Sequence, residues 1–525
     1  MLDRLFGYKV HHFLHVLGMS LFAFGLPLNK VLMSIGAIWG VSNLVLEGDF
    51  RSYWTRIKKN KIFHWLFAFF SIHILGLFWS TDTSYALHDL LIKLPLLSVP
   101  LAFVARTTLS RKNVHLILYA LLLSLLLTSL LNIGFYQQWF GFKEYTDIRQ
   151  LSLFGSHIRY GILIALGAVI CLYFIRETNS KLSKLLWFLL FGWFSMYTFY
   201  SQILSGAIAL VVIIFMYILL RIHSYSKRMS LVFATISLGI IFSSFYFLFQ
   251  GEKNVIDVHS LPKKTVEGND YVNCLNDKST ENNNRIYVSI CELELKREWE
   301  KISAIPFDKK DKANHPLKYT LIRYLTSKNI SKDALGMRKL TKIDIQNIEN
   351  GIASVNLLKT GMIARLYEIR HQINNHTDPN GNSLLQRIEY WKTGWHIIQS
   401  NWLMGVGTGD VQIAFDQQYE KENSMLLSKN RHRAHNMYLT VFISFGLVGL
   451  ILFLGVLYTY FKENLANKEL IPVLFISAVI CTFMIEDTIE TQMGVCLISL
   501  FLGLFMSKIE PSSTTSLNAT ASTNQ

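Results

Sequence analysis

The chain has 525 residues, of which 51% are hydrophobic and only 17% are charged, and its formal net charge is +15. Soluble domains carry about 25% charged residues, so the composition excludes an ordinary soluble protein. Repeated apolar runs of about 18 or more residues predict an all-α polytopic membrane protein instead.

About twelve apolar segments follow one another along the chain, each long enough to cross a hydrocarbon core of about 30 Å. The first lacks a small-residue cleavage site and is followed at once by another, so we interpret it as a retained span rather than a signal peptide. The segments lie at about 10–28, 30–46, 62–80, 86–105, 114–140, 153–175, 184–200, 202–220, 230–249, 436–460, 471–487 and 490–507.

Basic residues in the short loops predict the orientation of these spans. They follow the second, fourth, sixth, eighth and tenth spans, so both termini are expected in the cytoplasm. The long polar segment then lies on the outer face of the membrane, and we expect membrane lipids but no nucleic acid as partners. The loop cations are Arg51, Arg56, Lys58, Lys59, Lys61, Arg106, Arg111, Lys112, Arg176, Lys181, Lys184, Arg221, Lys227, Arg228, Lys462 and Lys468.

The polar segment separates two groups of spans. We expect transmembrane helices 1–9 in 1–249, an extracytoplasmic insertion in 250–380, a membrane-surface helix with a glycine-rich loop in 381–435, transmembrane helices 10–12 in 436–507 and a disordered cytoplasmic tail in 508–525.

Local patterns subdivide the polar segment. Apolar spacing predicts amphipathic helices in 317–325, 343–373 and 384–399. Cys274 and Cys291 share the insertion, and a disulfide between them is one option in an oxidising compartment.

Two arginines are candidates for binding an anion. Arg159 lies just inside the outer end of the sixth span, where a charge either faces a polar site or snorkels to the interface. Arg387 shares a face of the surface helix with Trp391, and the alternative there is a solvated charge. A guanidinium stays charged and matches the geometry of phosphate, so phosphate is the ligand that both arginines suit best.

His435 lies where the polar segment meets the tenth span, close to Arg433. Histidine is the side chain that titrates near neutral pH, so it is the natural candidate for moving a proton. We expect it to cap the span, near Glu486 and Asp487 at the outer end of the eleventh. The alternative is an interfacial histidine that anchors a helix end.

The segment Gly405-Val406-Gly407-Thr408-Gly409 permits positive φ and a close backbone approach, although by itself it predicts only a tight turn. No βαβ pattern surrounds it, so it is not a dinucleotide-binding fingerprint. Several basic groups and one titratable base thus converge on one membrane face, which favours an anionic, lipid-linked substrate.

Together these residues resemble the O-antigen ligase and polymerase superfamily. His435-Asn436, followed after nine residues by Gly446-Leu447-Val448-Gly449, is similar to its His-Asn…Gly-x-x-Gly signature. The stretch from Arg387 through Trp391 and Trp402 to Gly409 is similar to the segment before that motif, and Phe154–Arg159 to a second arginine-bearing region. One departure is Ser201–Gly206, where many relatives carry an arginine and this chain has Gln202.

The resemblance implies a GT-C-like membrane glycosyltransferase of lipopolysaccharide biosynthesis in the bacterial inner membrane. It would transfer a glycan from undecaprenyl diphosphate to lipid A-core or another glycan, with no cofactor and no metal. His435 would be the catalytic base, and Arg159 and Arg387 would bind the donor diphosphate. The supporting residues would be Asn436, Arg433, Glu486, Asp487, Gly405 and Gly407.

Three alternatives remain. A polymerase of the same superfamily would use a growing glycan as the acceptor. A transporter for lipid-linked glycans would need ionisable residues near the bilayer midplane and symmetry between its halves, and neither is evident. An inactive membrane scaffold would not depend on His435.

Overall fold

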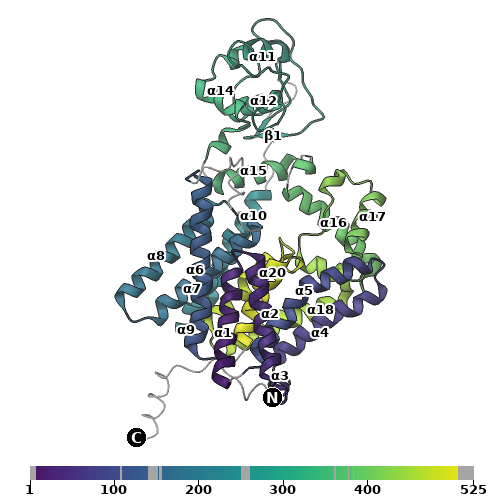
Figure 1. Ribbon diagram of the computed structural model, residues 1–525. Helices are drawn as coiled ribbons and strands as arrows, with labels where there is room; N and C mark the ends of the chain where they lie inside the picture. Colours follow the sequence, from purple (N-terminus) through teal and green to yellow (C-terminus); the bar gives the residue numbers. More distant parts are fainter. Residues whose placement is uncertain are drawn as a thin grey trace. The chain divides into compact units, whose positions relative to one another are not determined.

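Figure 1 shows the computed structural model, which describes residues 7–106, 109–139, 152, 156–249, 261–359, 362–375, 378–381 and 383–506. These residues are mostly helical. The strands among them are β1 (Thr280–Glu281) and β2 (Asn284–Arg285), which pair antiparallel. The predicted all-α class is therefore confirmed. The predicted tail at 508–525 lies outside the described residues, as do 250–260 of the expected insertion.

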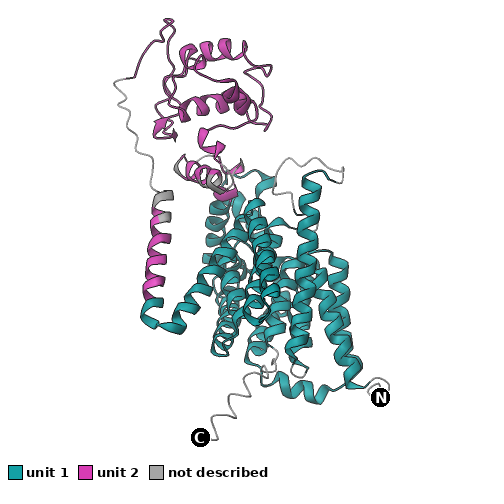
Figure 2. Ribbon diagram, turned by 90° about the vertical axis from the view of Figure 1, so that its left-hand side faces the viewer, with its two compact units in different colours: residues 1–230, 387–525 teal, residues 231–386 magenta. Residues whose placement is uncertain are grey.

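The chain forms two compact units, drawn in teal and magenta in Figure 2. The membrane unit comprises residues 1–230 and 387–525, and the insertion unit comprises residues 231–386. Helix α10 (Lys227–Phe249) begins in the first unit and continues into the second.

The membrane unit is a bundle of apolar helices with polar residues at their starts. Asn29, Asn60 and Ser110 each accept a hydrogen bond from the first turn of the helix that follows, which stabilises the start of that helix. The helices are α1 (Tyr8–Gly25), α2 (Lys30–Glu47), α3 (Phe50–Ile57), α4 (Lys61–Leu75), α5 (Thr83–Val104), α6 (Arg111–Tyr136), α7 (His157–Glu177), α8 (Lys181–Tyr200), α9 (Leu204–Tyr225), α16 (Ser383–Asn401), α17 (Val411–Lys421), α18 (Met437–Ala466), α19 (Leu470–Thr482) and α20 (Gln492–Met506).

Eight helices of the described residues are long and apolar enough to span a membrane: α2, α4 with the turn that extends it to Trp79, α5, α6, α7, α8, α9 and α18. Helices α19 and α20 are apolar but have only 13 and 15 residues. At 1.5 Å per residue, a 13-residue helix is about 20 Å long, short of a 30 Å core. The polytopic class is confirmed, while the count of twelve spans remains a prediction.

Contacts within the membrane unit define its two ends. At the basic end, Arg106 after α5 pairs with Glu47 at the end of α2. At the opposite end, Asp410 accepts hydrogen bonds from the backbone of Thr81 and Asp82, between α4 and α5. The loop cations therefore gather at the end away from the 405–410 loop. That the end with the 405–410 loop faces the periplasm remains a prediction.

The sequence analysis missed α3, which lies at the basic end. Its eight residues are too few for a periodic pattern to stand out. Phe50 and Trp54 are both 59% exposed, while the Tyr53 hydroxyl donates to Glu47 at 2.7 Å. An amphipathic helix of this kind suits the membrane surface.

The insertion unit has its own core, built around Trp299, Phe307, Leu321 and Tyr324. Its further helices are α11 (Glu292–Trp299), α12 (Leu317–Ser327), α13 (Ala334–Met337), α14 (Lys342–Glu349) and α15 (Met362–Asn375). The helix predicted at 317–325 is present as α12.

Two expectations for this unit are corrected. A helical pattern across 343–373 is broken, because α14 ends at Glu349 and Gly351 adopts φ +84°, which a helix does not accommodate. The suggested disulfide is not formed, since Cys274 and Cys291 are both free.

Four ionisable side chains form a buried cluster in the insertion unit. Arg323 pairs with Glu281 at 2.8 Å and with Glu368 at 3.0 Å, and His371 Nδ1 lies 3.0 Å from Glu281. The Ser354 hydroxyl donates to the other oxygen of Glu281 at 2.7 Å. Every charge in this insertion cluster (Glu281, Arg323, Glu368 and His371) thus has a partner.

Candidate active site

The start of α18 positions His435. The side chain of Asn436 accepts hydrogen bonds from the N–H groups of Tyr438 and Leu439 at 3.0 and 3.2 Å, and it donates to the Met484 carbonyl at 3.0 Å. The expectation that His435 caps this helix is therefore wrong, because Asn436 performs that role. His435 precedes the cap in a left-handed conformation, with φ 46°, which is uncommon for a residue other than glycine.

The glycine loop packs against a break in α18. Gly446 has φ 60° and ψ −158°, so the helix is interrupted there. The carbonyls of Ile443 and Ser444 accept instead from the N–H groups of Val406 and Gly407, at 2.8 and 2.9 Å. A broken helix within a membrane protein requires such replacement partners, and the loop supplies them.

Gly405 and Gly446 are required at this junction. Gly405 has φ +70°, and a Cβ there would lie 2.4 Å from the Ser444 carbonyl. A Cβ on Gly446 would lie 2.2 Å from the Leu403 carbonyl. The two glycine motifs that the sequence analysis singled out therefore fit against each other, and Gly405 and Gly407 have structural roles.

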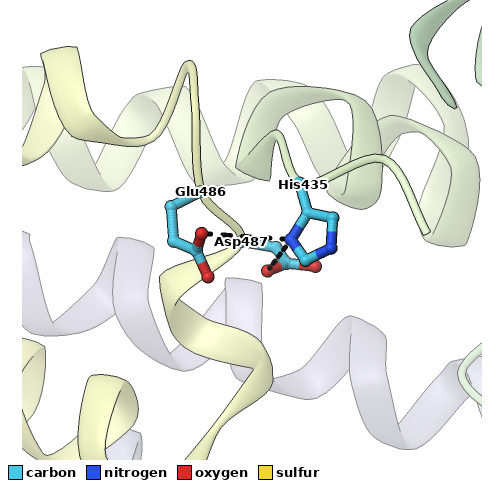
Figure 3. A group of neighbouring side chains, drawn as sticks. All are labelled: His435, Glu486 and Asp487. Atoms are coloured by element: carbon cyan, nitrogen blue, oxygen red, sulfur yellow. Dashed lines mark ion pairs between the residues drawn. The ribbon is translucent and has the colours of Figure 1, made fainter. Parts of the chain in front are cut away.

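Three side chains from two separate segments meet beside the start of α18: His435, and the adjacent Glu486 and Asp487 (Figure 3). His435 Nδ1 lies 3.6 Å from Asp487 Oδ1 and 3.9 Å from Glu486 Oε2. In Figure 3 both ion pairs run from Nδ1 rather than from Nε2. The side chain of His435 is 33% exposed, whereas those of Glu486 and Asp487 are 2% and 9% exposed.

Arg159, in the first turn of α7, completes this active-site cluster (Arg159, His435, Glu486 and Asp487). Its Nη2 lies 2.7 Å from Glu486 Oε1 and 3.8 Å from Asp487 Oδ1. Three buried atoms of the cluster form no hydrogen bond with described residues: Arg159 Nε, His435 Nδ1 and Glu486 Oε2.

The two carboxyl groups differ in their electrostatics. Burial raises the pKa of Glu486, and the neighbouring charge of Asp487 adds to this effect against the attraction of Arg159. Burial also acts to raise the pKa of Asp487, but interactions with His435 and Arg159 outweigh it, so that pKa is lowered. The pair therefore keeps negative charge on Asp487, the carboxylate nearer His435.

Arg387 and Trp391 of α16 hold the segments that carry the cluster. Arg387 Nε donates to the Ile485 carbonyl at 3.3 Å, and Trp391 Nε1 donates to the Ala434 carbonyl at 2.9 Å. These carbonyls immediately precede Glu486 and His435. The helix face predicted from the i, i+4 spacing thus lies against the site, and Arg387 is not a fully solvated charge.

Arg433 belongs to a neighbouring network rather than to the active-site cluster. It pairs with Glu490 at 3.0 Å and lies over the ring of Tyr85. Lys93, which is buried, pairs with Glu490 at 2.8 Å and with Asp89 at 2.7 Å. The sequence analysis missed Lys93, although its i, i+4 spacing from Asp89 within an apolar span was the available signal.

His435, Glu486 and Asp487 also have the donor types of a metal site. One ligand atom from each lies within 4.8 Å of the others, the one such group found among the described residues. Imidazole and carboxylate suit several divalent metals. Arg159, however, already pairs with the other oxygen of Glu486, so a cation there would lie close to a fixed positive charge.

This arrangement can perform base chemistry. Carboxylates that face Nδ1 favour a proton on that nitrogen, which leaves Nε2 as the acceptor. The guanidinium groups of Arg159 and Arg387 provide positive charge near Glu486, and both are attracted to it.

Comparison with known families gives a match to part of the chain. Residues 351–454 match the family model described as O-Antigen ligase, which supports the assignment of the chain to the O-antigen ligase superfamily and an O-antigen ligase- or polymerase-like function. The matched region includes Arg387, the glycine loop and His435, whereas Arg159, Glu486 and Asp487 lie outside it. No curated protein matches the chain.

Proposed function

We propose that this member of the O-antigen ligase superfamily is a glycan ligase of the bacterial inner membrane. It transfers an oligo- or polysaccharide from undecaprenyl diphosphate to an acceptor hydroxyl, such as that of lipid A-core, on the periplasmic face. The observation that carries the proposal is His435, whose Nδ1 faces Glu486 and Asp487 and whose side chain is 33% exposed.

His435 acts as the general base. The acceptor oxygen attacks the anomeric carbon, the bond from that carbon to the diphosphate oxygen breaks, and undecaprenyl diphosphate leaves with the bonding electrons. The hydroxyl proton passes to His435 Nε2, and Asp487 stabilises the imidazolium that forms. A base of this kind accelerates transfer by roughly 10²–10⁴-fold.

Arg159 and Arg387 bind the donor diphosphate and stabilise the charge that develops as it leaves. Arg159 holds Glu486 through Nη2, and its buried Nε remains available to the donor. These guanidinium groups supply the positive charge that a metal would otherwise provide, so the transfer is metal-independent. Addition of a chelator should leave the rate unchanged, whereas a loss that added metal restores would contradict this point.

The direct test is transfer by the purified full-length protein in detergent, with lipid-linked glycan as the donor. We expect His435→Ala to lower transfer at least 100-fold while donor binding persists. His432→Ala is the matched control, because that neighbouring ring lies 6.2 Å from His435 and does not pair with the carboxylates. If His435→Ala transferred glycan at the wild-type rate, His435 would not be the base. Movement of lipid-linked glycan across vesicles without transfer would indicate a transporter.

A cellular assay separates the ligase from the polymerase of the same superfamily. Cells that lack a ligase accumulate full-length glycan on the lipid carrier. Cells that lack a polymerase instead carry single repeat units on the core, and that outcome would favour the alternative.

A further inference from the structure

An open groove of about 600 Å³ lies between α4 and α18 in the membrane unit. Its walls include Lys61, Trp65, Tyr458 and Lys462. Lys61 is the first residue of α4, and Lys462 lies near the end of α18, so the groove opens at the basic end of the bundle. It is therefore separate from the active-site cluster, which lies before the start of α18.

In this groove the ring of Trp65 packs against the backbone of α18 at Gly455. A Cβ on Gly455 would lie 2.3 Å from the Trp65 ring, so the absence of a side chain at this position lets the indole pack against α18. Further along the same helices, Phe67, Ile451 and Leu454 are 54%, 52% and 43% exposed. Large apolar side chains exposed on membrane-spanning helices are in contact with lipid chains, so the groove continues a lipid-facing surface.

The cations of the groove lack carboxylate partners. Neither Lys61 nor Lys462 forms an ion pair with any carboxylate that the structure describes, although Lys462 lies 5.6 Å over the ring of Tyr458. Glu463 is the one carboxylate in the groove lining, which leaves an excess of positive charge. An anion is the complementary ligand.

Helix α3 indicates where the basic end of the bundle lies relative to the membrane surface. Its exposed Phe50 and Trp54 form an apolar face, and Lys58 lies 5.0 Å over the Trp54 ring. Helices of this kind lie at the boundary between headgroups and acyl chains. Because α3 directly precedes α4, Lys61 lies at the level of the lipid headgroups.

We propose that the α4/α18 groove binds an acidic phospholipid of the surrounding bilayer. The phosphate lies between Lys61 and Lys462, and an acyl chain follows the exposed apolar side chains of α4 and α18. Basic sites between membrane helices bind anionic headgroups for this reason, with about 1 kcal/mol from each lysine near the surface.

The test is native mass spectrometry of the full-length protein in detergent. The probes are palmitoyl-oleoyl phosphatidylglycerol, phosphatidylcholine with the same acyl chains, and water-soluble glycerol 3-phosphate. The test variant is Lys61→Gln with Lys462→Gln. The matched control is Lys181→Gln with Lys184→Gln, which removes two exposed lysines from the start of α8 at the same end.

We expect the unmodified protein to prefer phosphatidylglycerol to phosphatidylcholine. The groove variant should bind phosphatidylglycerol about 10- to 30-fold more weakly, as expected for the loss of two lysines, while the control stays within about threefold. An equal loss in the control would show a general effect of surface charge and overturn the proposal. So would a groove variant that keeps the full preference, or glycerol 3-phosphate that binds as tightly as the lipid.

Discussion

The two units each contain a buried cluster with the same types of side chain: one arginine, one histidine and two carboxylates. In the insertion cluster, Arg323 contacts both carboxylates, and both oxygens of Glu281 have partners. In the active-site cluster, Glu486 has one oxygen without a hydrogen bond, and His435 Nδ1 has none within the described residues.

This difference supports the proposal that one cluster is structural and the other functional. A buried polar group that lacks a partner costs roughly 1–3 kcal/mol, so unpaired atoms are rare in native proteins. A complete network stabilises its unit, whereas a network with unpaired atoms and a partly exposed imidazole is suited to binding and proton transfer. The same residue types therefore serve different purposes according to how completely they are paired.

The largest expected effect is that of Asp487→Asn on transfer. An amide beside Nδ1 no longer stabilises the imidazolium and can favour the wrong tautomer, so we expect transfer to fall by roughly 10³–10⁴-fold. Rates of transfer for Asp487→Asn, His435→Ala and the double variant form a double-mutant cycle. If Asp487 acts through His435, the double variant will be no slower than His435→Ala, whereas additive losses would contradict that role.

A smaller effect, on stability rather than on catalysis, is expected for Glu281→Gln. Removal of one partner from a buried ion network should lower the local free energy of unfolding by about 3 kcal/mol. Hydrogen–deuterium exchange of α12 and α15 measures this change. The control is Glu292→Gln, whose exposed pair with Lys318 at 3.4 Å should contribute at most about 1 kcal/mol.

The stability that Glu281→Gln loses relative to wild type should depend on pH, because of the environment of Glu281. Burial acts to raise its pKa, but interactions with His371 and Arg323 outweigh burial and lower the pKa to about 2. A lowered pKa gives stability that is fully present above the unfolded value of about 4.3 and is lost as the pH falls towards 2. The exchange difference between Glu281→Gln and wild type should therefore be largest near neutral pH and shrink below pH 4, and a constant difference would contradict the proposed pairing.

The smallest effect concerns the loop that supports the active-site cluster. Gly405→Ala places a Cβ against the backbone at Ser444 in a left-handed conformation, which should cost roughly 2 kcal/mol. Gly192→Ala is the control, because nothing lies within 4 Å of a Cβ there and alanine favours a helix. Thermal unfolding and hydrogen–deuterium exchange of α18 should show that Gly405→Ala is the less stable of the two variants. Neither variant should change exchange at the insertion cluster. Equal stability of the two variants would contradict the close packing at Gly405.

Much of the site followed from the sequence because its signals are local. Motif spacing identified His435, the glycine loop and the helix face of Arg387, and the acidic pair 486–487 stood out at the end of an apolar run. The sequence could not show that Arg159 pairs with Glu486, since those residues are 327 positions apart. It also misplaced the helix cap, because His435 and Asn436 are adjacent and only the backbone conformation shows which one accepts from the helix.

The sequence by itself determined the membrane class and the all-α fold, and it supplied the residues proposed to bind phosphate and transfer a proton. Composition and hydropathy carry that information residue by residue, without reference to distant contacts. Only the tertiary structure decided which charges are fully paired and which remain available. Pairing depends on the packing of α7, α16, α18 and the segment between α19 and α20, and no local pattern encodes those distances.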